Sequence, residues 1–85
     1  MAEIEMYTKG FCGYCFAAKR LLKKKSLPFT EVPIDRDPGL REEMIQRSGR
    51  FTVPQIFING QPIGGYTEIS SLEQSGQLDI LLTAE

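Results

Sequence analysis

Residues 8–22 read TKGFCGYCFAAKRLL and hold both cysteines of the chain, Cys12 and Cys15, with two residues between them. The apolar alternation before this stretch predicts a strand over residues 4–7, and the pattern after the cysteines predicts a helix over residues 16–22. Cys12 then lies on the turn that opens the helix. Residues three apart on a helix face the same way, so the two thiols can close a small disulfide.

The position of Cys12 favours its thiolate form. At the start of a helix the backbone N–H groups have no intrahelical acceptor, and the helix dipole favours negative charge. Lys9, three residues upstream, adds a cation and is the third candidate catalytic residue beside the two cysteines. Cys15 lies one turn inside the helix, so we expect it to be less exposed and closer to an ordinary thiol. These positions predict that Cys12 attacks first and that Cys15 acts second.

Other uses of a CxxC pair are weaker here. A chain with two cysteines and no histidine cannot supply the usual four Cys/His ligands of zinc, so no metal site is expected from it alone. A disulfide across so short a loop removes little entropy from the unfolded chain, which argues against a structural role. A CxxC pair near a βαβ pattern is typical of thioredoxin-like redox chemistry, although a free cysteine can also be a small buried hydrophobe.

The composition indicates one small domain over residues 1–85, with 41% apolar residues. The sequence contains no run of 18 apolar residues and no basic region followed by an apolar segment near its start. We therefore expect a soluble, cytoplasmic protein, in a reducing compartment where a lone CxxC pair can cycle. Ten basic and eleven acidic residues nearly cancel, which argues against partners such as nucleic acid or a membrane surface.

One local cluster of cations lies in the second half of the predicted first helix: Lys19, Arg20, Lys23, Lys24 and Lys25. Cations at this end of a helix complement the negative end of its dipole, which favours a solvated face. Docking of an acidic partner protein is the alternative.

The first half of the chain predicts a βαβ unit. Pro28 ends the first helix, and residues 29–34 alternate as a second strand, in which Pro33 favours an edge position. Two strands joined by a helix in this way are parallel. The cysteine turn then lies at the carboxyl end of the first strand, where ligands usually bind in open α/β sheets.

The second half predicts a helix, a hairpin and another helix. Asp37 followed by Pro38 is a helix start, and Gly49 is a helix stop. Residues 55–58 and 61–63 are short apolar runs around an Asn-Gly pair, which predicts a β-hairpin. Thr67 is expected to cap a third helix, followed by a last helical turn or two. The predicted architecture is α/β: βαβ, α, ββ, α, one mixed four-stranded sheet with helices on both faces.

Two stretches outside the cysteines are candidate binding elements. Residues 52–54, Thr-Val-Pro, are either a plain helix-to-strand turn or a place where the Val53 backbone pairs with an extended peptide. Residues 65–68 begin a helix, whose free amides can bind a carboxylate with help from the Thr67 hydroxyl, or Thr67 only caps it. Tyr14 and Tyr66 are either surface aromatics or the walls of a groove for a peptide thiol.

Together these residues resemble the glutaredoxin family, of thioredoxin fold. The likeness spans nearly the whole chain, in YTKGFCGYCFAAKRLL, REEMIQRSGRFTVPQIFING and IGGYTE. Thioredoxin itself is less similar, since it is longer and typically carries a tryptophan beside its first cysteine, whereas this chain has none.

The resemblance implies a role for each matching position. Cys12 matches the nucleophile and Cys15 the resolving thiol. The positions that match the glutathione site are Lys9, Cys12, Tyr14, Thr52, Val53, Pro54, Gly65, Tyr66, Thr67 and Glu68. In the family, the residue at Val53 pairs through its backbone with the cysteinyl part of glutathione, the proline at Pro54 is cis, and residues 65–68 hold the γ-glutamyl end.

The sequence departs from the commonest family pattern in two places. Gly13 replaces the usual proline between the cysteines, which restores an N–H and loosens the turn. Thr67 and Glu68 stand where paired aspartates are frequent, a milder change because a hydroxyl and a carboxylate can still cap the helix.

The implied function is that of a monomeric, glutathione-dependent thiol–disulfide oxidoreductase. It reduces protein disulfides and protein–glutathione mixed disulfides, with glutathione as reductant and cosubstrate. One alternative is a cluster carrier, in which two subunits and two glutathiones hold a [2Fe-2S] cluster and Cys12 is a ligand. Another is a glutaredoxin-like electron donor that is reduced by thioredoxin reductase.

Overall fold

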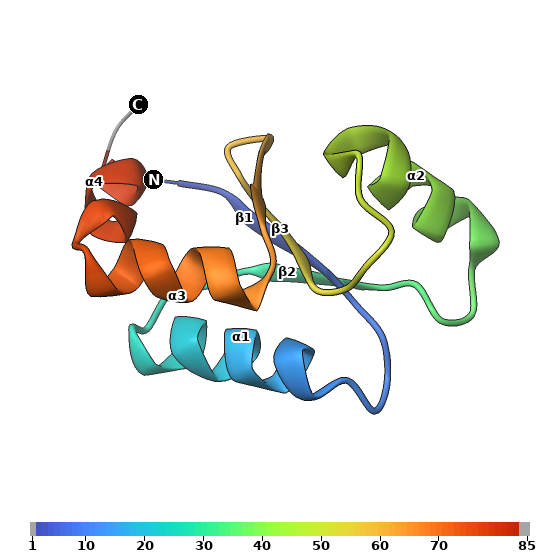
Figure 1. The fold of residues 1–85 in the computed structure, drawn as a ribbon, viewed down its shortest axis with the longest axis horizontal. Coiled ribbons are helices and arrows are strands. Elements are labelled where there is room, and N and C mark those ends of the chain that lie inside the picture. Colours follow the sequence, from blue (N-terminus) through green and yellow to red (C-terminus); the bar gives the residue numbers. More distant parts are fainter. Residues whose placement is uncertain (1, 84–85) are drawn as a thin grey trace.

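A computed structural model describes residues 2–83 of the chain. Residues 1, 84 and 85, which belong to the predicted domain, lie outside the described residues. The elements follow one another along the chain (Figure 1) as β1 (Ile4–Thr8), α1 (Gly13–Lys24), β2 (Thr30–Pro33), α2 (Pro38–Ser48), β3 (Gln55–Ile58), β4 (Gln61–Gly64), α3 (Tyr66–Gln74) and α4 (Gln77–Thr83).

The four strands form one mixed sheet in the order β2-β1-β3-β4. β1 runs parallel to β2, with Met6 opposite Glu31, and antiparallel to β3, with Met6 opposite Ile56. β3 and β4 form an antiparallel hairpin. The predicted βαβ unit and hairpin are therefore confirmed, and Pro33 lies on an edge strand, where its missing N–H breaks no ladder.

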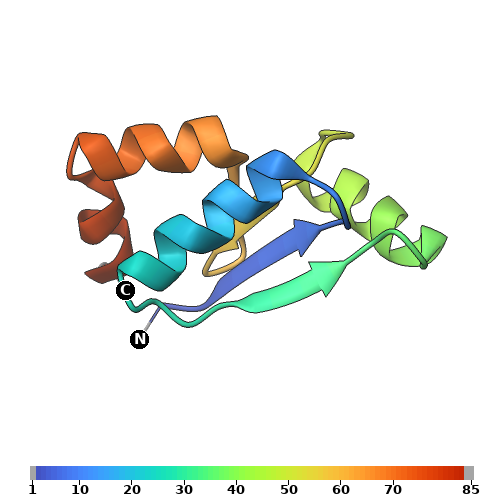
Figure 2. The ribbon, with the colours of Figure 1, turned by 90° about the horizontal axis from the view of Figure 1, so that it is seen from below.

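Helices cover both faces of the sheet, as predicted. Successive residues of a strand point to opposite faces, so β1 and β3 each supply two cores. The larger core lies between the sheet and α1, α3 and α4, and α1 and α3 lie side by side over it (Figures 1 and 2). The smaller core lies under α2 and contains Tyr7, Ile34, Met44 and Phe57.

Local signals place the ends of α2 and the hairpin turn. The Asp37 carboxylate accepts hydrogen bonds from the N–H groups of Gly39 at 2.9 Å and Leu40 at 3.2 Å, which caps α2. Gly49 ends the helix in the left-handed conformation, with φ of 72°. Asn59 and Gly60 both have positive φ, as a two-residue hairpin turn requires.

The expected cap of the third helix was wrong. Gly65, in extended conformation, precedes the helix, and Thr67 is an exposed residue of its first turn. The Glu68 carboxylate reaches back to accept the Gly65 N–H at 2.7 Å, a different bond from the one predicted for the Thr67 hydroxyl, which was expected to accept N–H groups of the first turn. A glutamate at the third helical position is long enough to make this bond, which is half of a capping box.

Several element boundaries also differ from the prediction, and β1 and β4 each end one residue later than expected. α1 begins at Gly13, directly after Cys12, and not at Phe16. β2 is shorter by one residue at each end than the predicted strand over residues 29–34. Ends of elements depend on hydrogen bonds to neighbouring segments, which a local pattern does not contain.

Lys25 was expected to lie on a solvated face together with the other cations of the first helix, but it forms ion pairs instead. Its Nζ lies 2.9 Å from a carboxylate oxygen of Glu73 and 2.9 Å from one of Asp79. These ion pairs join the end of α1 to α3 and to α4, two elements far along the chain. No helix within residues 2–83 is long and apolar enough to cross a membrane.

Candidate functional site

The two cysteines lie at the start of α1, just after the turn that follows β1. Cys12 is the N-cap of the helix, in extended conformation, and its Sγ accepts a hydrogen bond from the Cys15 backbone N–H at 3.2 Å. The helix start therefore points a backbone donor at the sulfur, as the sequence predicted. Cys12 is 9% exposed and Cys15 is 1% exposed, which confirms the predicted order of accessibility.

Cys15 is held in its protonated form by its surroundings. Burial in the core is the largest cause that raises the pKa of the Cys15 thiol, to about 12, and the neighbouring Cys12 sulfur raises it further. The backbone of Lys9 and the charge of Lys19 act in the opposite direction with smaller effect. At neutral pH, Cys15 is thus a thiol with little access to solvent.

Selective alkylation checks this difference between the sulfurs. We expect iodoacetamide at pH 8 to modify one thiol per chain, and peptide mass spectrometry to place it at Cys12, because only a thiolate reacts readily. Modification of Cys15 should rise only in strongly alkaline solution or after unfolding in denaturant. Equal labelling of both cysteines in the folded protein at pH 8 would contradict the assignment.

A cavity of about 420 Å³ opens beside the cysteines. Lys9, exposed on its rim, shares this cavity with both sulfurs, so the structure brings together the three predicted catalytic residues. Its lining consists of Thr8, Lys9, Gly10, Cys12, Cys15, Phe16, Lys19, Glu31, Pro33, Asp35 and Arg36.

A small polar network in this cavity was missed by the sequence analysis. The Glu31 carboxylate accepts hydrogen bonds from Thr8 Oγ1 at 2.7 Å and from Lys19 Nζ at 3.0 Å. The Thr8 hydroxyl and then the Lys19 ammonium hold the pKa of Glu31 below its usual range. These residues meet through the pairing of β1 with β2 and the packing of α1, so no local motif contains the network.

A second cavity, of about 280 Å³, lies beyond Cys12 and collects the remaining predicted binding residues. Its lining consists of Tyr14, Arg50, Thr52, Val53, Pro54, Gly65, Tyr66, Thr67 and Glu68. We call this cavity the Tyr14–Thr67 groove. Lys9 and Cys12 line the first cavity and not the groove, but Cys12 Sγ lies 3.9 Å from the Val53 carbonyl oxygen and so adjoins both.

The floor of the groove offers backbone groups. The Val53–Pro54 peptide bond is cis, as the resemblance implied. Within residues 2–83, the Val53 N–H takes part in no hydrogen bond, and its carbonyl oxygen faces the Cys12 sulfur. An extended peptide can therefore pair with Val53 beside the reactive sulfur.

The groove has an aromatic wall. The rings of Tyr14 and Tyr66 stack with centroids 6.1 Å apart and planes at 27°. Tyr14 comes from α1 and Tyr66 from the start of α3, so the stack links the two helix starts that face the groove.

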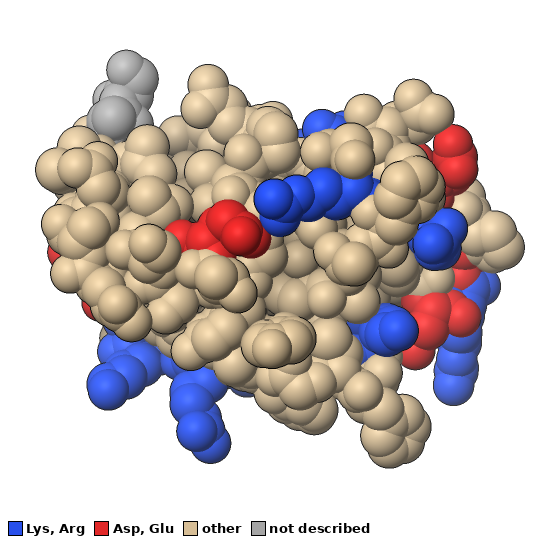
Figure 3. Space-filling view, viewed as in Figure 1, with Lys and Arg blue, Asp and Glu red and all other residues tan. Residues whose placement is uncertain are grey.

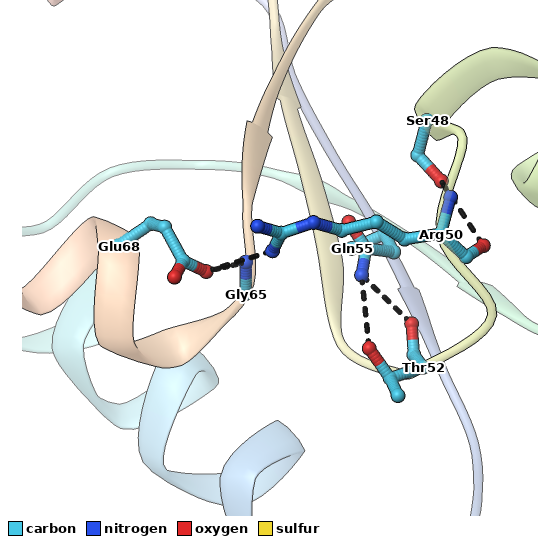
Figure 4. Close-up of polar contacts among 6 residues, drawn as sticks. All are labelled: Ser48, Arg50, Thr52, Gln55, Gly65 and Glu68. Atoms are coloured by element: carbon cyan, nitrogen blue, oxygen red, sulfur yellow. Dashed lines mark hydrogen bonds and ion pairs between the residues drawn. The ribbon is translucent and has the colours of Figure 1, made fainter.

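The opposite end of the groove is charged. The Glu68 carboxylate accepts the Gly65 N–H and also an Arg50 guanidinium N–H at 3.1 Å (Figure 4). The Gly65 N–H and then Arg50 hold the pKa of Glu68 below its usual range, so this carboxylate is ionised at neutral pH. The N–H groups of Tyr66 and Thr67 lie in the first helical turn, where no intrahelical acceptor exists.

Arg50 is the groove residue that the sequence analysis missed. Its position just before the Thr-Val-Pro turn was the available signal, but only the fold brings it to Glu68, 18 residues away. Figure 4 also shows the Gln55 amide donating to the carbonyl and hydroxyl oxygens of Thr52, at 2.9 Å and 3.3 Å. These bonds hold the turn that presents Val53.

The described part of the chain contains no cluster of side chains that could bind a metal ion. Among residues 2–83, no three His, Cys, Asp or Glu side chains gather so that they could hold a metal ion. The cluster alternative takes Cys12 from each of two subunits, an arrangement that a single chain does not test. It therefore stays a prediction.

Comparison with known proteins gives one consistent family. The family model described as Glutaredoxin matches residues 4–63. Glutaredoxin 3 of Escherichia coli strain K12 is 55% identical over 82 residues, which cover 96% of this chain and 99% of that protein. The solution structure of glutaredoxin from Brucella melitensis is similar with a TM-score of 0.85 at 45% identity, covering 96% of this chain and 89% of that one. A crystal structure of a buckwheat glutaredoxin–glutathione complex has a TM-score of 0.87 at 27% identity, covering 96% and 77%.

Proposed function

The chain belongs to the glutaredoxin family of thiol oxidoreductases, with a thioredoxin-like fold, and from this premise we propose that it is glutathione-dependent. The substrates are protein disulfides and protein–glutathione mixed disulfides, and glutathione is the reductant. The observation that carries this proposal is the Tyr14–Thr67 groove, which adjoins the Cys12 sulfur at Val53 and combines a free backbone edge with a helix start. A tripeptide thiol needs these features beside the sulfur that it must reach.

Two of the three residues of glutathione have complementary groups in the groove. The Val53 N–H and C=O are placed to pair with the backbone of the cysteinyl residue, which sets the glutathione sulfur beside Cys12. The first-turn N–H groups of Tyr66 and Thr67 are donors for the α-carboxylate of the γ-glutamyl residue. The ionised Glu68 carboxylate suits the α-amino group of the same residue, and Tyr14 covers the apolar stem.

The first chemical step is a thiol–disulfide exchange. The Cys12 thiolate attacks the glutathione sulfur of a glutathionylated protein, a new S–S bond forms between Cys12 and glutathione, and the old S–S bond breaks. The protein leaves as a thiolate and takes a proton from solvent. The Cys15 N–H bond to Cys12 Sγ stabilises the negative charge on the attacking sulfur before the reaction.

Two routes complete the cycle. A second glutathione thiolate can attack the glutathione sulfur of the mixed disulfide, which releases glutathione disulfide and restores the Cys12 thiolate. With a protein disulfide as substrate, Cys12 first forms a mixed disulfide with the protein, and Cys15 then attacks the Cys12 sulfur, which closes the Cys12–Cys15 disulfide and releases the protein dithiol. One glutathione thiolate then opens this disulfide at Cys12, and a second one removes the first as glutathione disulfide, which restores both thiols.

The pKa of Cys15 fits the order of these steps. The Cys12 sulfur is one cause of the raised pKa of Cys15, through its hydrogen bond and its charge. Once Cys12 is bonded in a mixed disulfide, its negative charge is gone, and the pKa of Cys15 falls from its raised value. Burial, the largest cause, remains, so the first step lowers the pKa of Cys15 only in part and makes Cys15 a better nucleophile than it was before that step.

A coupled assay tests the proposed function. We expect turnover of a glutathionylated peptide when glutathione, glutathione reductase and NADPH are supplied. We expect only the uncatalysed rate when thioredoxin reductase and NADPH replace them. The reverse result would favour the electron donor that thioredoxin reductase reduces.

Binding can be observed without turnover. Titration with S-methylglutathione, which cannot form a disulfide, should shift the amide resonances of Val53, Tyr66 and Thr67, while Asn59 and Gly60 in the hairpin turn act as internal controls. Shifts confined to the hairpin, or none at all, would overturn the assignment of the groove. We propose that the protein works as a monomer in the cytoplasm, and gel filtration with glutathione present checks the first part.

A further inference from the structure

The outer face of α1 forms a second binding feature that the proposed chemistry does not use. It is a groove of about 780 Å³, and the side chains that define it are Phe16, Lys19, Arg20, Lys23 and Lys24, with Gly13 at one end. We call it the basic groove. Figure 3 shows Lys and Arg side chains projecting below the region that α1 occupies in Figure 1.

The charge of this groove contrasts with that of the chain. Ten basic and eleven acidic residues give the chain a net charge of −1, yet the lining of the groove contains four cations and no carboxylate. Within residues 2–83, Lys19 pairs with Glu31 at 3.0 Å, and no ion pair takes up Arg20, Lys23 or Lys24, which are exposed. Three positive charges thus face solvent along one helix.

The basic groove starts one residue after Cys12. Gly13 follows Cys12 directly, and Phe16 lines both the basic groove and the cavity that holds the two cysteines. Phe16 is 65% exposed, and the Lys19 ammonium lies 5.1 Å from its ring centroid. An aromatic ring this exposed, beside cations and one turn from the sulfur, is a contact for an apolar side chain.

The geometry of disulfide exchange at Cys12 favours the basic groove as the surface that meets the protein substrate. A thiolate attacks a disulfide through one sulfur while the other sulfur leaves, so the two halves of the substrate extend in different directions from Cys12. The glutathione half lies in the Tyr14–Thr67 groove, and that groove shares no lining residue with the basic groove. The protein half then faces the cavity that holds the two cysteines, and Phe16 joins that cavity to the basic groove.

We propose that the basic groove binds an acidic segment of the protein substrate, with an apolar side chain on Phe16 and Asp or Glu residues along Arg20, Lys23 and Lys24. This inference rests on the proposed function and names the substrate class. The connection to Cys12 favours a polypeptide over an anionic lipid surface, because only a substrate attached through its sulfur must lie at this end of the helix. Exposed charges of this kind act mainly on the rate of encounter.

Three glutathionylated peptides with one cysteine each test the proposal. They differ only in the residues beside the cysteine, which are acidic, neutral or basic. We expect kcat/KM to be about tenfold higher for the acidic than for the neutral peptide at low salt, and the preference to fade above about 0.3 M salt. The triple variant Arg20→Glu, Lys23→Glu, Lys24→Glu should lose the preference for the acidic peptide or reverse it.

Matched single variants separate a local effect from one of net charge. Arg20→Glu on α1 and Arg41→Glu on α2 each reverse one exposed charge in a helix, and only the first should lower kcat/KM for the acidic peptide. A glutathionylated small thiol, which has no segment to bind, should be turned over by all variants at the wild-type rate, and this also checks their folding. A wild type that fails on this small substrate would refute the proposed function itself.

Three results would refute the docking surface. They are a wild type with no preference for the acidic peptide, a preference that persists in the triple variant, and a loss in Arg41→Glu that equals the loss in Arg20→Glu.

Discussion

Replacement of Cys12 by serine is expected to lower turnover of a glutathionylated peptide by at least about 1,000-fold. The serine hydroxyl is almost un-ionised at neutral pH, and it cannot form the mixed disulfide on which both routes of the cycle depend. The Cys15 N–H, which donates to Cys12 Sγ at 3.2 Å, then has no sulfur to contact. The measurement is kcat/KM in the coupled glutathione assay, with covalent adducts followed by intact mass.

Cys15→Ser is the matched control, because it makes the same change in the same helix, three residues further on. This variant should still remove glutathione from the peptide and should accumulate the Cys12–glutathione adduct. It should lose the reduction of protein disulfides that needs an attack by Cys15. If Cys12→Ser stays active while Cys15→Ser is dead, the roles of the two sulfurs are reversed.

Gly64→Ala is expected to cost roughly 2–4 kcal/mol of unfolding free energy, or a fall of roughly 10–20 °C in Tm. Gly64 is the buried last residue of β4, with φ of 118°, a conformation that alanine adopts only under strain. An added Cβ would lie 2.7 Å from Cγ and Oε1 of Glu68, so the side chain that caps α3 would have to move. Loss of that cap also disturbs the charged end of the Tyr14–Thr67 groove.

Gly60→Ala provides the control for this second prediction. Gly60 also has a positive φ, of 80°, but a Cβ added there in the hairpin turn would meet no atom of a non-neighbouring residue within 4 Å. We expect it to cost only about 1 kcal/mol, from backbone strain alone. Denaturant unfolding at pH 7 compares the two variants, and equal losses would show that the contact with Glu68 does not matter.

The sequence predicted those features that depend on near neighbours. The CxxC pair at a helix start, the Asp37 cap, the Gly49 stop and the Asn-Gly hairpin turn each rest on bonds within a few residues. The family resemblance added the residues of the Tyr14–Thr67 groove other than Arg50, and the cis bond before Pro54, which the structure contains. Their roles toward glutathione remain proposals that the assays above test.

Two kinds of prediction failed. In one, two neighbouring residues could both cap the same helix, and in the other, the bonding partner lies far along the chain. Thr67 was an acceptable cap by residue type, but Glu68 one position later reaches the Gly65 N–H. Lys25 looked like the other lysines of α1, yet it alone of them meets Glu73 and Asp79. The hydrophobic and charge pattern of a single helix predicts neither the bond of Glu68 nor the ion pairs of Lys25.

The amino-acid sequence by itself determined the order of the elements, the position of the cysteines at a helix start and the two faces of the sheet. Hydrophobic period, caps and turn residues act over a few positions, so they can be read locally. Only the tertiary structure decided that Arg50 meets Glu68, that Tyr14 stacks on Tyr66 and that Glu31 joins Thr8 and Lys19 beside the cysteines. These contacts join residues that are distant in sequence, and their geometry is set by how the strands pair and how α1 and α3 pack on the sheet.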